Sequence, residues 1–327
     1  MSPAAALLLL ALLATAAAPA QNPPAAKPRP AAPAGSTPAA PAAKPQPYQV
    51  EPTRRDVPYG RHPKQVLDFW RAKAEGPSPV LVYIHGGGWR NGDRTKVGSL
   101  LRQCLDRGIS VVSVSYRFVQ EAGDERPPVR APLTDAARAV QFVRSKAGEW
   151  GLDKRRVALS GSSAGACSSL WIAFRDDLAD PASKDPVARE STRVLGAAVV
   201  GPQTTLDPAQ MREWTPNSTY GGHAFGIKGD FGAFLAERER LLPLIRQYSP
   251  YELVSRDDPP VALFFKAPPA MGKPEKDATH SANFGVGLKR RCDELGVTCT
   301  LTYPGADNPR YAREIDFIAA TLKGSGP

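Results

Sequence analysis

The stretch "RVALSGSSAGACSSLWIAF" (residues 156–174) decides the fold that we expect for this chain. Its first part, "RVALSG" (156–161), is typical of a short buried strand, and "AGACSSLWIAF" (164–174) is typical of a buried helix. Only small residues separate the two parts, so the chain has to turn sharply from strand to helix. We therefore predict a strand–turn–helix unit with serines 160, 162 and 163 at the turn.

Short apolar segments alternate with amphipathic segments on both sides of this unit. The predicted strands are residues 79–85, 110–118, 194–201, 261–267 and 298–305. The predicted helices are residues 96–108, 133–150, 283–296 and 312–323. Alternation of strands and helices at this spacing is typical of a mostly parallel sheet with helices on both faces. The sequence therefore predicts a doubly wound α/β fold.

Residues 203–250 interrupt this alternation with a long, aromatic and glycine-containing segment. One helix is predicted in it, near 232–246. An insertion of this size in an α/β domain is usually a lid or a substrate-binding cap. Two interpretations of its aromatic side chains stay open, an apolar acyl or aryl site and the core of the lid itself. These side chains are Trp214, Tyr220, Phe225, Phe231 and Phe234.

The N-terminal part of the chain does not have the composition of the folded domain. Residues 1–20 contain the apolar run "AAALLLLALLATAAA" and end in an A-x-A pattern, which predicts a signal peptide cleaved after Ala20; an uncleaved anchor is the alternative. Residues 21–47 are mostly Pro and Ala, which predicts a disordered spacer. The folded domain is then expected over residues 48–327, in a secreted or periplasmic protein without a membrane-spanning segment after cleavage.

Composition and charge are those of a globular protein, with 42% hydrophobic and 23% charged residues. The formal net charge of +10 is scattered, and its densest clusters, "DKRR" (153–156) and "LKRR" (288–291), lack interleaved aromatic residues. We therefore expect solvated surface there and no nucleic-acid partner. The four cysteines show no metal-ligand spacing, and Cys292 and Cys299 are expected either to form a disulfide or to remain buried thiols.

One serine of the quoted stretch is the candidate nucleophile. The pentapeptide "GSSAG" (161–165) fits the G-x-S-x-G pattern in one frame only, with Ser163 at its centre. The sharp turn leaves no room for side chains beside the nucleophile, which explains the two glycines. The turn also places the Ser163 hydroxyl at the N-terminus of a helix, where developing negative charge is stabilised.

A glycine-rich loop upstream matches this nucleophile. The segment "YIHGGGWRNGD" (83–93) begins directly after a predicted strand. Three consecutive glycines free the backbone to aim N–H groups at one point, as an oxyanion hole requires. We expect the N–H groups of Gly87, Gly88 and Ala164 to form this hole, and His85 to hold the loop in place.

The motifs "HGGGW", "VSYRF" and "GSSAG" carry a family resemblance. The chain resembles an α/β-hydrolase of the hormone-sensitive-lipase-like carboxylesterase group, near bacterial esterases of feruloyl and acetyl esters, over about residues 53–323. The resemblance implies a serine nucleophile, an acid after the next-to-last strand and a histidine after the last strand. Asp277 matches the acid position, 19 residues before the glycine that ends the next helix; the alternative is a surface carboxylate.

The position that the family gives to the histidine holds Asn308, and neither Asn308 nor the nearby Tyr311 can act as a general base near neutral pH. In a first interpretation His280 is the base, on a loop that reaches across about 10 Å, or two strand spacings. In a second, His223 of the insertion is the base. In a third there is no base, and the loss of about 10⁶ in kcat leaves only a ligand-binding domain.

The function predicted from the sequence is a serine carboxylesterase. It cleaves small or carbohydrate-linked esters through an acyl-Ser163 intermediate, and it needs no metal or organic cofactor. The competing hypothesis is a catalytically impaired protein that binds a ligand beneath the 203–250 insertion.

Overall fold

The computed structural model describes residues 50–323. The predicted signal peptide (1–20) and spacer (21–47) lie outside this range and stay predictions. Within it, no helix is long and apolar enough to cross a membrane.

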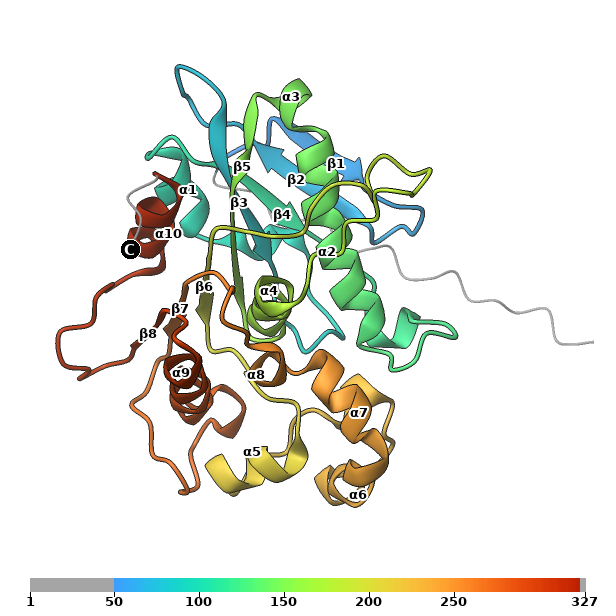
Figure 1. Ribbon diagram of the computed structural model, residues 1–327, viewed down its shortest axis with the longest axis vertical. Coiled ribbons are helices and arrows are strands. Elements are labelled where there is room, and N and C mark those ends of the chain that lie inside the picture. Colours follow the sequence, from blue (N-terminus) through green and yellow to red (C-terminus); the bar gives the residue numbers. More distant parts are fainter. Residues whose placement is uncertain (1–49, 324–327) are drawn as a thin grey trace, which may run out of the picture. The chain divides into compact units, whose positions relative to one another are not determined.

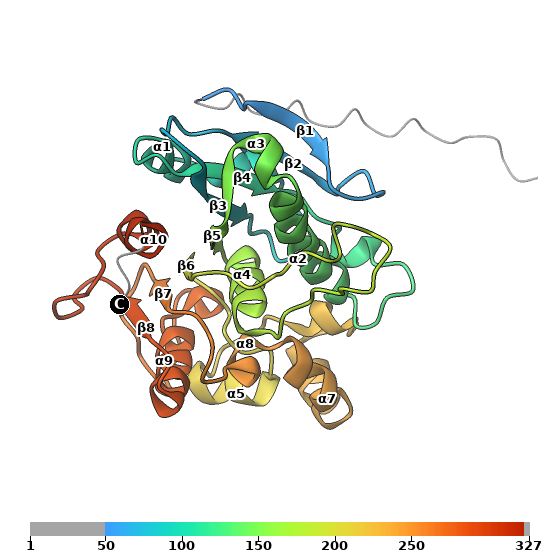
Figure 2. The ribbon, with the colours of Figure 1, turned by 45° about the horizontal axis from the view of Figure 1, so that its top comes forward.

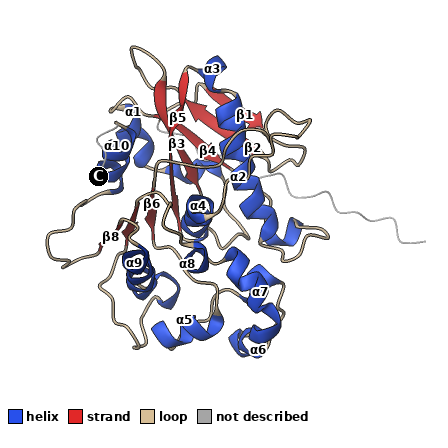
Figure 3. Cartoon of the chain, in the orientation of Figure 1, coloured by secondary structure: helices blue, strands red, loops and turns tan. Residues whose placement is uncertain are grey.

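The described part of the chain is built on one eight-stranded sheet with the strand order β1-β2-β4-β3-β5-β6-β7-β8 (Figures 1 and 3). The strands are β1 (Arg54–Pro58), β2 (Val66–Trp70), β3 (Ser78–Ile84), β4 (Ser110–Val114), β5 (Leu152–Ser162), β6 (Ala197–Val200), β7 (Val261–Phe264) and β8 (Cys299–Thr302). Strand β2 pairs antiparallel with both β1 and β4, and the other neighbours are parallel. The parallel strands therefore all end at the same edge of the sheet.

Helices cover both faces of this sheet, as predicted (Figure 2). On one face lie α2 (Arg130–Ser145), α4 (Ala164–Phe174) and α9 (Asn283–Leu295), and on the other lie α1 (Leu100–Leu105) and α10 (Glu314–Leu322). Side chains alternate along β3 accordingly: Val82 and Ile84 join the core under α2 and α4, and Leu81 joins the core under α1 and α10. A strand that is buried on both faces is apolar at every position.

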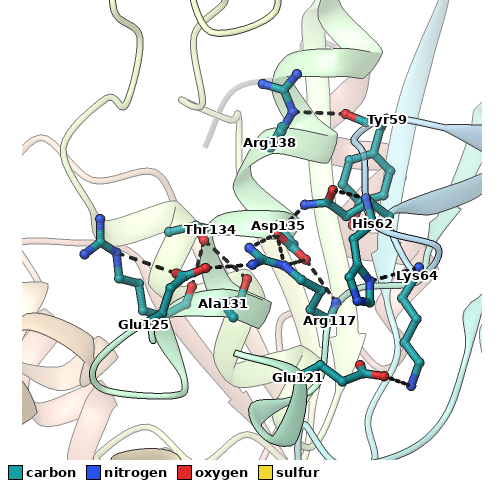
Figure 4. Close-up of polar contacts among 12 residues, drawn as sticks. Tyr59, His62, Lys64, Arg117, Glu121, Glu125, Ala131, Thr134, Asp135 and Arg138 are labelled. Carbon is teal, nitrogen blue, oxygen red and sulfur yellow. Dashed lines mark hydrogen bonds and ion pairs between the residues drawn. The ribbon is translucent and has the colours of Figure 1, made fainter. Parts of the chain in front are cut away.

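Two predicted elements are shorter or more divided than expected. The strand predicted over 110–118 ends at Val114. Residues 115–118 leave the sheet, because the Tyr116 hydroxyl donates to the carbonyl of His85 and Arg117 pairs with the buried Asp135 of α2 (Figure 4). The helix predicted over 96–108 is a 3-10 turn, η1 (Arg94–Val97), followed by α1, because Gly98 has a φ of 61°.

The predicted helix over 133–150 begins earlier, at Arg130, and is also divided. Helix α2 ends at Ser145, and the short α3 (Ala147–Trp150) follows after Lys146. Glycine 151, with a φ of 66°, ends α3 in the left-handed conformation that favours glycine.

The prediction of a single helix near 232–246 is wrong, because two helices occupy that range. The segment contains α5 (Pro208–Trp214), η3 (Gly222–Phe225), α6 (Phe231–Ala236), α7 (Arg238–Tyr248) and the short α8 (Pro250–Leu253). The helix is interrupted at Glu237, whose φ and ψ of −86° and 0° are not helical. Four of the five insertion aromatics are buried in the core, namely Trp214, Phe225, Phe231 and Phe234. The lid-core interpretation therefore holds for these four, and Tyr220 lines a cavity instead.

The four cysteines are free, buried thiols in this structure. Cys292 of α9 and Cys299 of β8 face each other closely enough for a hydrogen bond, which raises the pKa of Cys299. For Cys292 and Cys299 the sequence left a disulfide and two buried thiols open, and the structure has the buried thiols.

Candidate active site

The turn after β5 holds Ser163 in an unusual backbone conformation. Ser163 is the single residue between β5 and α4, and it has a φ of 53° and a ψ of −123°. Such a conformation is strained for any residue with a side chain. Its own N–H donates to the carbonyl of Val200 on β6, at 2.9 Å. The surrounding structure thus holds the hydroxyl at the beginning of α4, above the carboxyl edge of the sheet.

Both glycines of "GSSAG" are required by close backbone contacts. A Cβ on Gly165 would lie 2.1 Å from the carbonyl oxygen of Ile84, and one on Gly161 would lie 2.6 Å from the backbone of Gly165. Real Cβ atoms do not approach other atoms so closely. The glycines therefore let α4 pack directly against the end of β3, as the motif predicts.

His280 reaches the Ser163 hydroxyl. Its Nε2 lies 2.9 Å from Ser163 Oγ, and its Nδ1 lies 2.9 Å and 3.1 Å from the two carboxylate oxygens of Asp277. Because a carboxylate only accepts, Nδ1 carries the proton, and Nε2 is left with a lone pair that accepts the Ser163 O–H. The structure thus brings together three of the residues predicted from the sequence, in the order Asp277, His280, Ser163.

A short 3-10 turn, η4 (Ala278–His280), places the imidazole. Asp277 caps this turn, because its Oδ1 accepts the backbone N–H of His280 at 3.2 Å. Strand β6 separates β5 from β7, so the loop after β7 crosses the two strand spacings that the sequence argument required. Gly201, at the end of β6, lies beside His280 and has a φ of 55°, a left-handed conformation that favours glycine.

Two buried side chains that the sequence reasoning missed hold this loop. Gln203 Nε2 donates to the carbonyl of Thr279 at 2.7 Å. Asn283 Nδ2 donates to the carbonyls of Trp214 and Ala270, and its Oδ1 accepts the N–H of Ala270 at 2.8 Å. The only sequence signal for Gln203 and Asn283 is that each is a polar residue at the start of a segment, the 203–250 insertion and the predicted helix 283–296. Polar residues are common at such positions, so this signal does not single them out.

The Asp277–His280 pair is open to solvent. The side chains of Asp277 and His280 are 67% and 40% exposed. Partial burial raises the pKa of Asp277, but the hydrogen bonds and the charge of His280 outweigh this effect and hold the pKa below its usual value. The carboxylate is therefore ionised at neutral pH, where it can stabilise a positive imidazolium.

The glycine loop after β3 lies beside Ser163. A Cβ on Gly86 would lie 3.2 Å from Ser163 Cβ. The carbonyl of Gly86 accepts from His85 Nδ1 at 2.7 Å, and the carbonyl of Gly87 accepts the N–H groups of Arg90 and Asn91 at 3.0 and 3.2 Å. Because trans peptides are planar, the N–H groups of Gly87 and Gly88 point away from these partners. These two glycines, Ser163 and His280 line one cavity of about 530 Å³.

Two other histidines support this loop without contacting Ser163 in the described structure. His85 is buried and stacks on Tyr116 with ring centroids 4.2 Å apart, and burial lowers its pKa to about 4. His223 Nε2 lies 2.9 Å from the carbonyl oxygen of Gly88, and burial and the charge of Arg90 lower its pKa to about 4. The structure therefore brings His280, and not His223, to the Ser163 hydroxyl.

The family's histidine position lies outside this arrangement. Asn308, with a φ of 41°, sits in the loop between β8 and α10. It lines neither of the two cavities that include Ser163, which are the one beside the glycines and one of about 590 Å³ beneath Asp277 and Lys266.

Comparisons with known proteins agree with this fold. The model of the BD-FAE family matches residues 67–267, more than half of the chain. Among curated proteins, esterase LipC of Mycobacterium tuberculosis is 34% identical over 117 residues, which are 34% of this chain and 27% of LipC. The probable isoprenylcysteine alpha-carbonyl methylesterase ICMEL1 of Arabidopsis thaliana is 31% identical over 143 residues, which are 43% of this chain and 29% of that protein. The matched segments thus span less than a third of these relatives.

Solved structures match over most of the chain. A truncated carbohydrate esterase from gut microbiota has a TM-score of 0.63 at 17% identity and covers 83% of this chain and 96% of its own. Thermogutta terrifontis esterase 2, phosphoramylated by tabun, has a TM-score of 0.59 at 20% identity, with 86% and 98% covered. These likenesses confirm the predicted α/β-hydrolase fold. With the family model matched over most of the sheet and both motif loops, the chain belongs to the BD-FAE family.

Proposed function

We propose that this protein is a serine carboxylesterase that works through an acyl-Ser163 intermediate. The observation that carries the proposal is the continuous hydrogen-bonded chain from Asp277 through His280 to Ser163 Oγ. A nucleophile, a base within hydrogen-bond reach and a third group that orients the base are the parts of such a mechanism. The relatives that are named as esterases support the same activity.

In the acylation step, Ser163 Oγ attacks the ester carbonyl while His280 Nε2 takes its proton. The carbonyl oxygen becomes negative, and the N–H groups of Gly87, Gly88 and Ala164 receive it; Ala164 is the first residue of α4, so its N–H has no acceptor inside the helix. His280 then gives the proton to the leaving alcohol. Asp277 holds the Nδ1–H and stabilises the imidazolium.

In the deacylation step, water takes the place of the alcohol. His280 Nε2 accepts a proton from this water, whose oxygen attacks the acyl carbon, and the second tetrahedral intermediate uses the same N–H groups. Its collapse returns the proton to Ser163 Oγ and releases the acid. All proton transfers pass through one nitrogen, which explains why its position matters more than that of any other atom here.

The substrate class that we propose is a small or carbohydrate-linked carboxylic ester. Ser163 and His280 line two cavities, of about 590 and 530 Å³, which is the usual size range of small-molecule sites. Two cavities that meet at the nucleophile can hold the acyl and the alcohol parts of one ester. The similar structure that is titled a carbohydrate esterase supports the carbohydrate-linked part of the proposal. We also propose export, supported by the apolar run within residues 1–20.

One observation favours a second candidate, a ligand-binding protein with impaired catalysis. The position that normally carries the base holds Asn308. The 2.9 Å contact between His280 Nε2 and Ser163 Oγ favours the esterase, because it supplies a base from another loop.

A labelling and turnover experiment separates the two candidates. Wild type and the variants Ser163→Ala, His280→Ala and His223→Ala are incubated with a fluorophosphonate probe and with 4-nitrophenyl acetate. Wild type is expected to be labelled and to turn over. Loss of Ser163 abolishes labelling, and loss of His280 lowers kcat by about 10⁶. The matched variant His223→Ala keeps most of the activity, because His223 Nε2 contacts the Gly88 carbonyl and not Ser163 Oγ. Wild type without labelling and turnover would refute the esterase, and full activity of His280→Ala would refute its role as base.

A further inference from the structure

Three lysines line the cavities around Ser163, and none has an ion pair or side-chain hydrogen bond within residues 50–323. Lys96 lines the cavity beside the glycine loop, and Lys266 and Lys276 line the cavity beneath Asp277. They come from three separate segments, η1, the end of β7 and the residue before Asp277. The three lysines therefore reach the cavities around Ser163 from separate parts of the chain.

The carboxylates in these cavities are already engaged. Asp277 binds His280 Nδ1, and Glu275 Oε1 accepts the backbone N–H of Ala270 at 3.2 Å. Some other lysines of the described part, such as Lys64 and Lys289, form salt bridges with acidic neighbours. The two lysines and two carboxylates that line the cavity beneath Asp277 balance in formal charge, and within the described part the lysines are the members without a side-chain partner.

A third cavity, of about 520 Å³, continues the site along the ends of β7 and β8. It shares Val200 and Lys266 with the cavity that contains Ser163. Its other lining residues are uncharged and include Phe264, Phe265 and Tyr303, so that Lys266 is its only charged side chain within the described range. The loop 303–313, which would carry a histidine in the pattern that the family resemblance implies, borders this cavity without reaching Ser163. Lys266 thus stands at the junction of two connected cavities.

We propose that these connected cavities bind an ester substrate that carries a carboxylate, with Lys266 as its main contact and Lys276 as the second. A carboxylate that enters an uncharged cavity loses water and needs a charged partner there, and Lys266 supplies it. The described lining of the third cavity contains no carboxylate, so Lys266 meets such a substrate there without a competing negative charge. The proposal rests on the proposed esterase activity and adds the charge of the substrate to it.

The test compares matched esters that differ only in charge. For a carboxylate on the alcohol part, 4-acetoxybenzoate is compared with its methyl ester. For a carboxylate on the acyl part, mono-4-nitrophenyl adipate is compared with methyl 4-nitrophenyl adipate. The kcat/KM of each ester is measured for wild type, Lys266→Gln, Lys276→Gln and the control Lys73→Gln. Lys73 is exposed and lies near Gly108, before β4, at the opposite edge of the sheet.

In at least one pair we expect wild type to prefer the anionic ester by about fivefold or more at low salt, as for one exposed ion pair. Lys266→Gln is expected to reduce this preference by about fivefold, Lys276→Gln by a smaller factor and Lys73→Gln by less than twofold. Added sodium chloride reduces the preference in wild type, because exposed charges are screened.

The possible outcomes separate the proposal of an anionic substrate from the proposed esterase activity. Equal kcat/KM for anionic and neutral esters in both pairs, or a preference that survives in Lys266→Gln and Lys276→Gln, overturns the anionic-substrate proposal and leaves the esterase intact. Absence of turnover for all four esters overturns the proposed function as well. The pair that shows the preference tells which part of the ester carries the carboxylate.

Discussion

Replacing Asp277 with asparagine removes the negative charge beside His280 and keeps the shape of the side chain. Asparagine has the same shape, and its Oδ1 can still accept the N–H of His280 and cap η4. What is lost is the attraction between the carboxylate and the imidazolium that forms during each proton transfer. The variant also replaces one acceptor oxygen at Nδ1 by an NH2 group, so it measures the loss of the charge together with a weaker preference for the Nδ1–H tautomer.

The expected magnitude follows from the distance and the exposure of the pair. Two unit charges 2.9 Å apart attract by about 1.4 kcal/mol in bulk water and by about 6 kcal/mol at an effective dielectric constant of about 20. Since about 1.4 kcal/mol is tenfold in rate, these bounds correspond to about tenfold and about 10⁴-fold in kcat. Asp277 is 67% exposed and His280 is 40% exposed, so solvent screens the pair and the lower part of this range applies. We expect a loss of about 10², less than the loss of about 10⁴ at a buried triad carboxylate.

The assay measures the hydrolysis of 4-nitrophenyl acetate at saturating substrate, and it compares the kcat values for wild type, Asp277→Asn, Asp277→Ala and a matched control. The control is Asp230→Asn, because Asp230 caps α6 by accepting the N–H of Ala233 at 3.0 Å, away from Ser163. Asp277→Ala also removes the cap and should lose more activity than Asp277→Asn. An unchanged kcat in Asp277→Asn would refute the coupling to His280, and a loss as large as that in His280→Ala would refute the screening argument.

Three further predictions concern the stability of the site's framework. Burial raises the pKa of Glu314, which accepts from Ser160 Oγ of β5, from 4.5 to about 7. Between these two values the unfolded chain loses its proton while the folded protein keeps it, so Glu314→Gln should gain stability over wild type as pH rises from 4.5 to 7, by up to about 3 kcal/mol; a difference that does not change with pH in chemical denaturation would contradict this. Gly165→Ala places a Cβ 2.1 Å from the Ile84 carbonyl and should lower the free energy of unfolding by about 3 kcal/mol or more, whereas Gly148→Ala, where nothing lies within 4 Å, should not; equal unfolding midpoints would refute the steric argument. Asp135 is 2% exposed and pairs with Arg117 at 2.7 Å, so Asp135→Asn leaves the guanidinium without this partner and should cost about 3 kcal/mol in urea unfolding; a loss below about 1 kcal/mol would show that Glu125 alone satisfies Arg117.

Local sequence patterns were enough to predict the fold and the part of the candidate site around Ser163. The alternation of strands and helices predicted the doubly wound sheet, because a strand that is buried on both faces is apolar throughout. Spacing alone selected Ser163 among three serines, because only its frame has glycines where the backbone of α4 approaches β3. Element ends were less predictable. Residues 115–118 look like a strand but leave the sheet, because Arg117 is drawn to the buried Asp135 of α2, a partner 18 residues further along the chain.

The sequence by itself determined the strand–turn–helix unit, the place of Ser163 at its turn and the glycine loop, since each depends on residues within one short segment. It left His280 and His223 as open candidates, because the distance between Ser163 and either histidine depends on how separate loops cross the sheet. The tertiary structure decided this point: Gln203 and Asn283 hold the loop after β7, and His280 thereby reaches Ser163. A contact across 117 residues of sequence has no local signature, and only packing can place it.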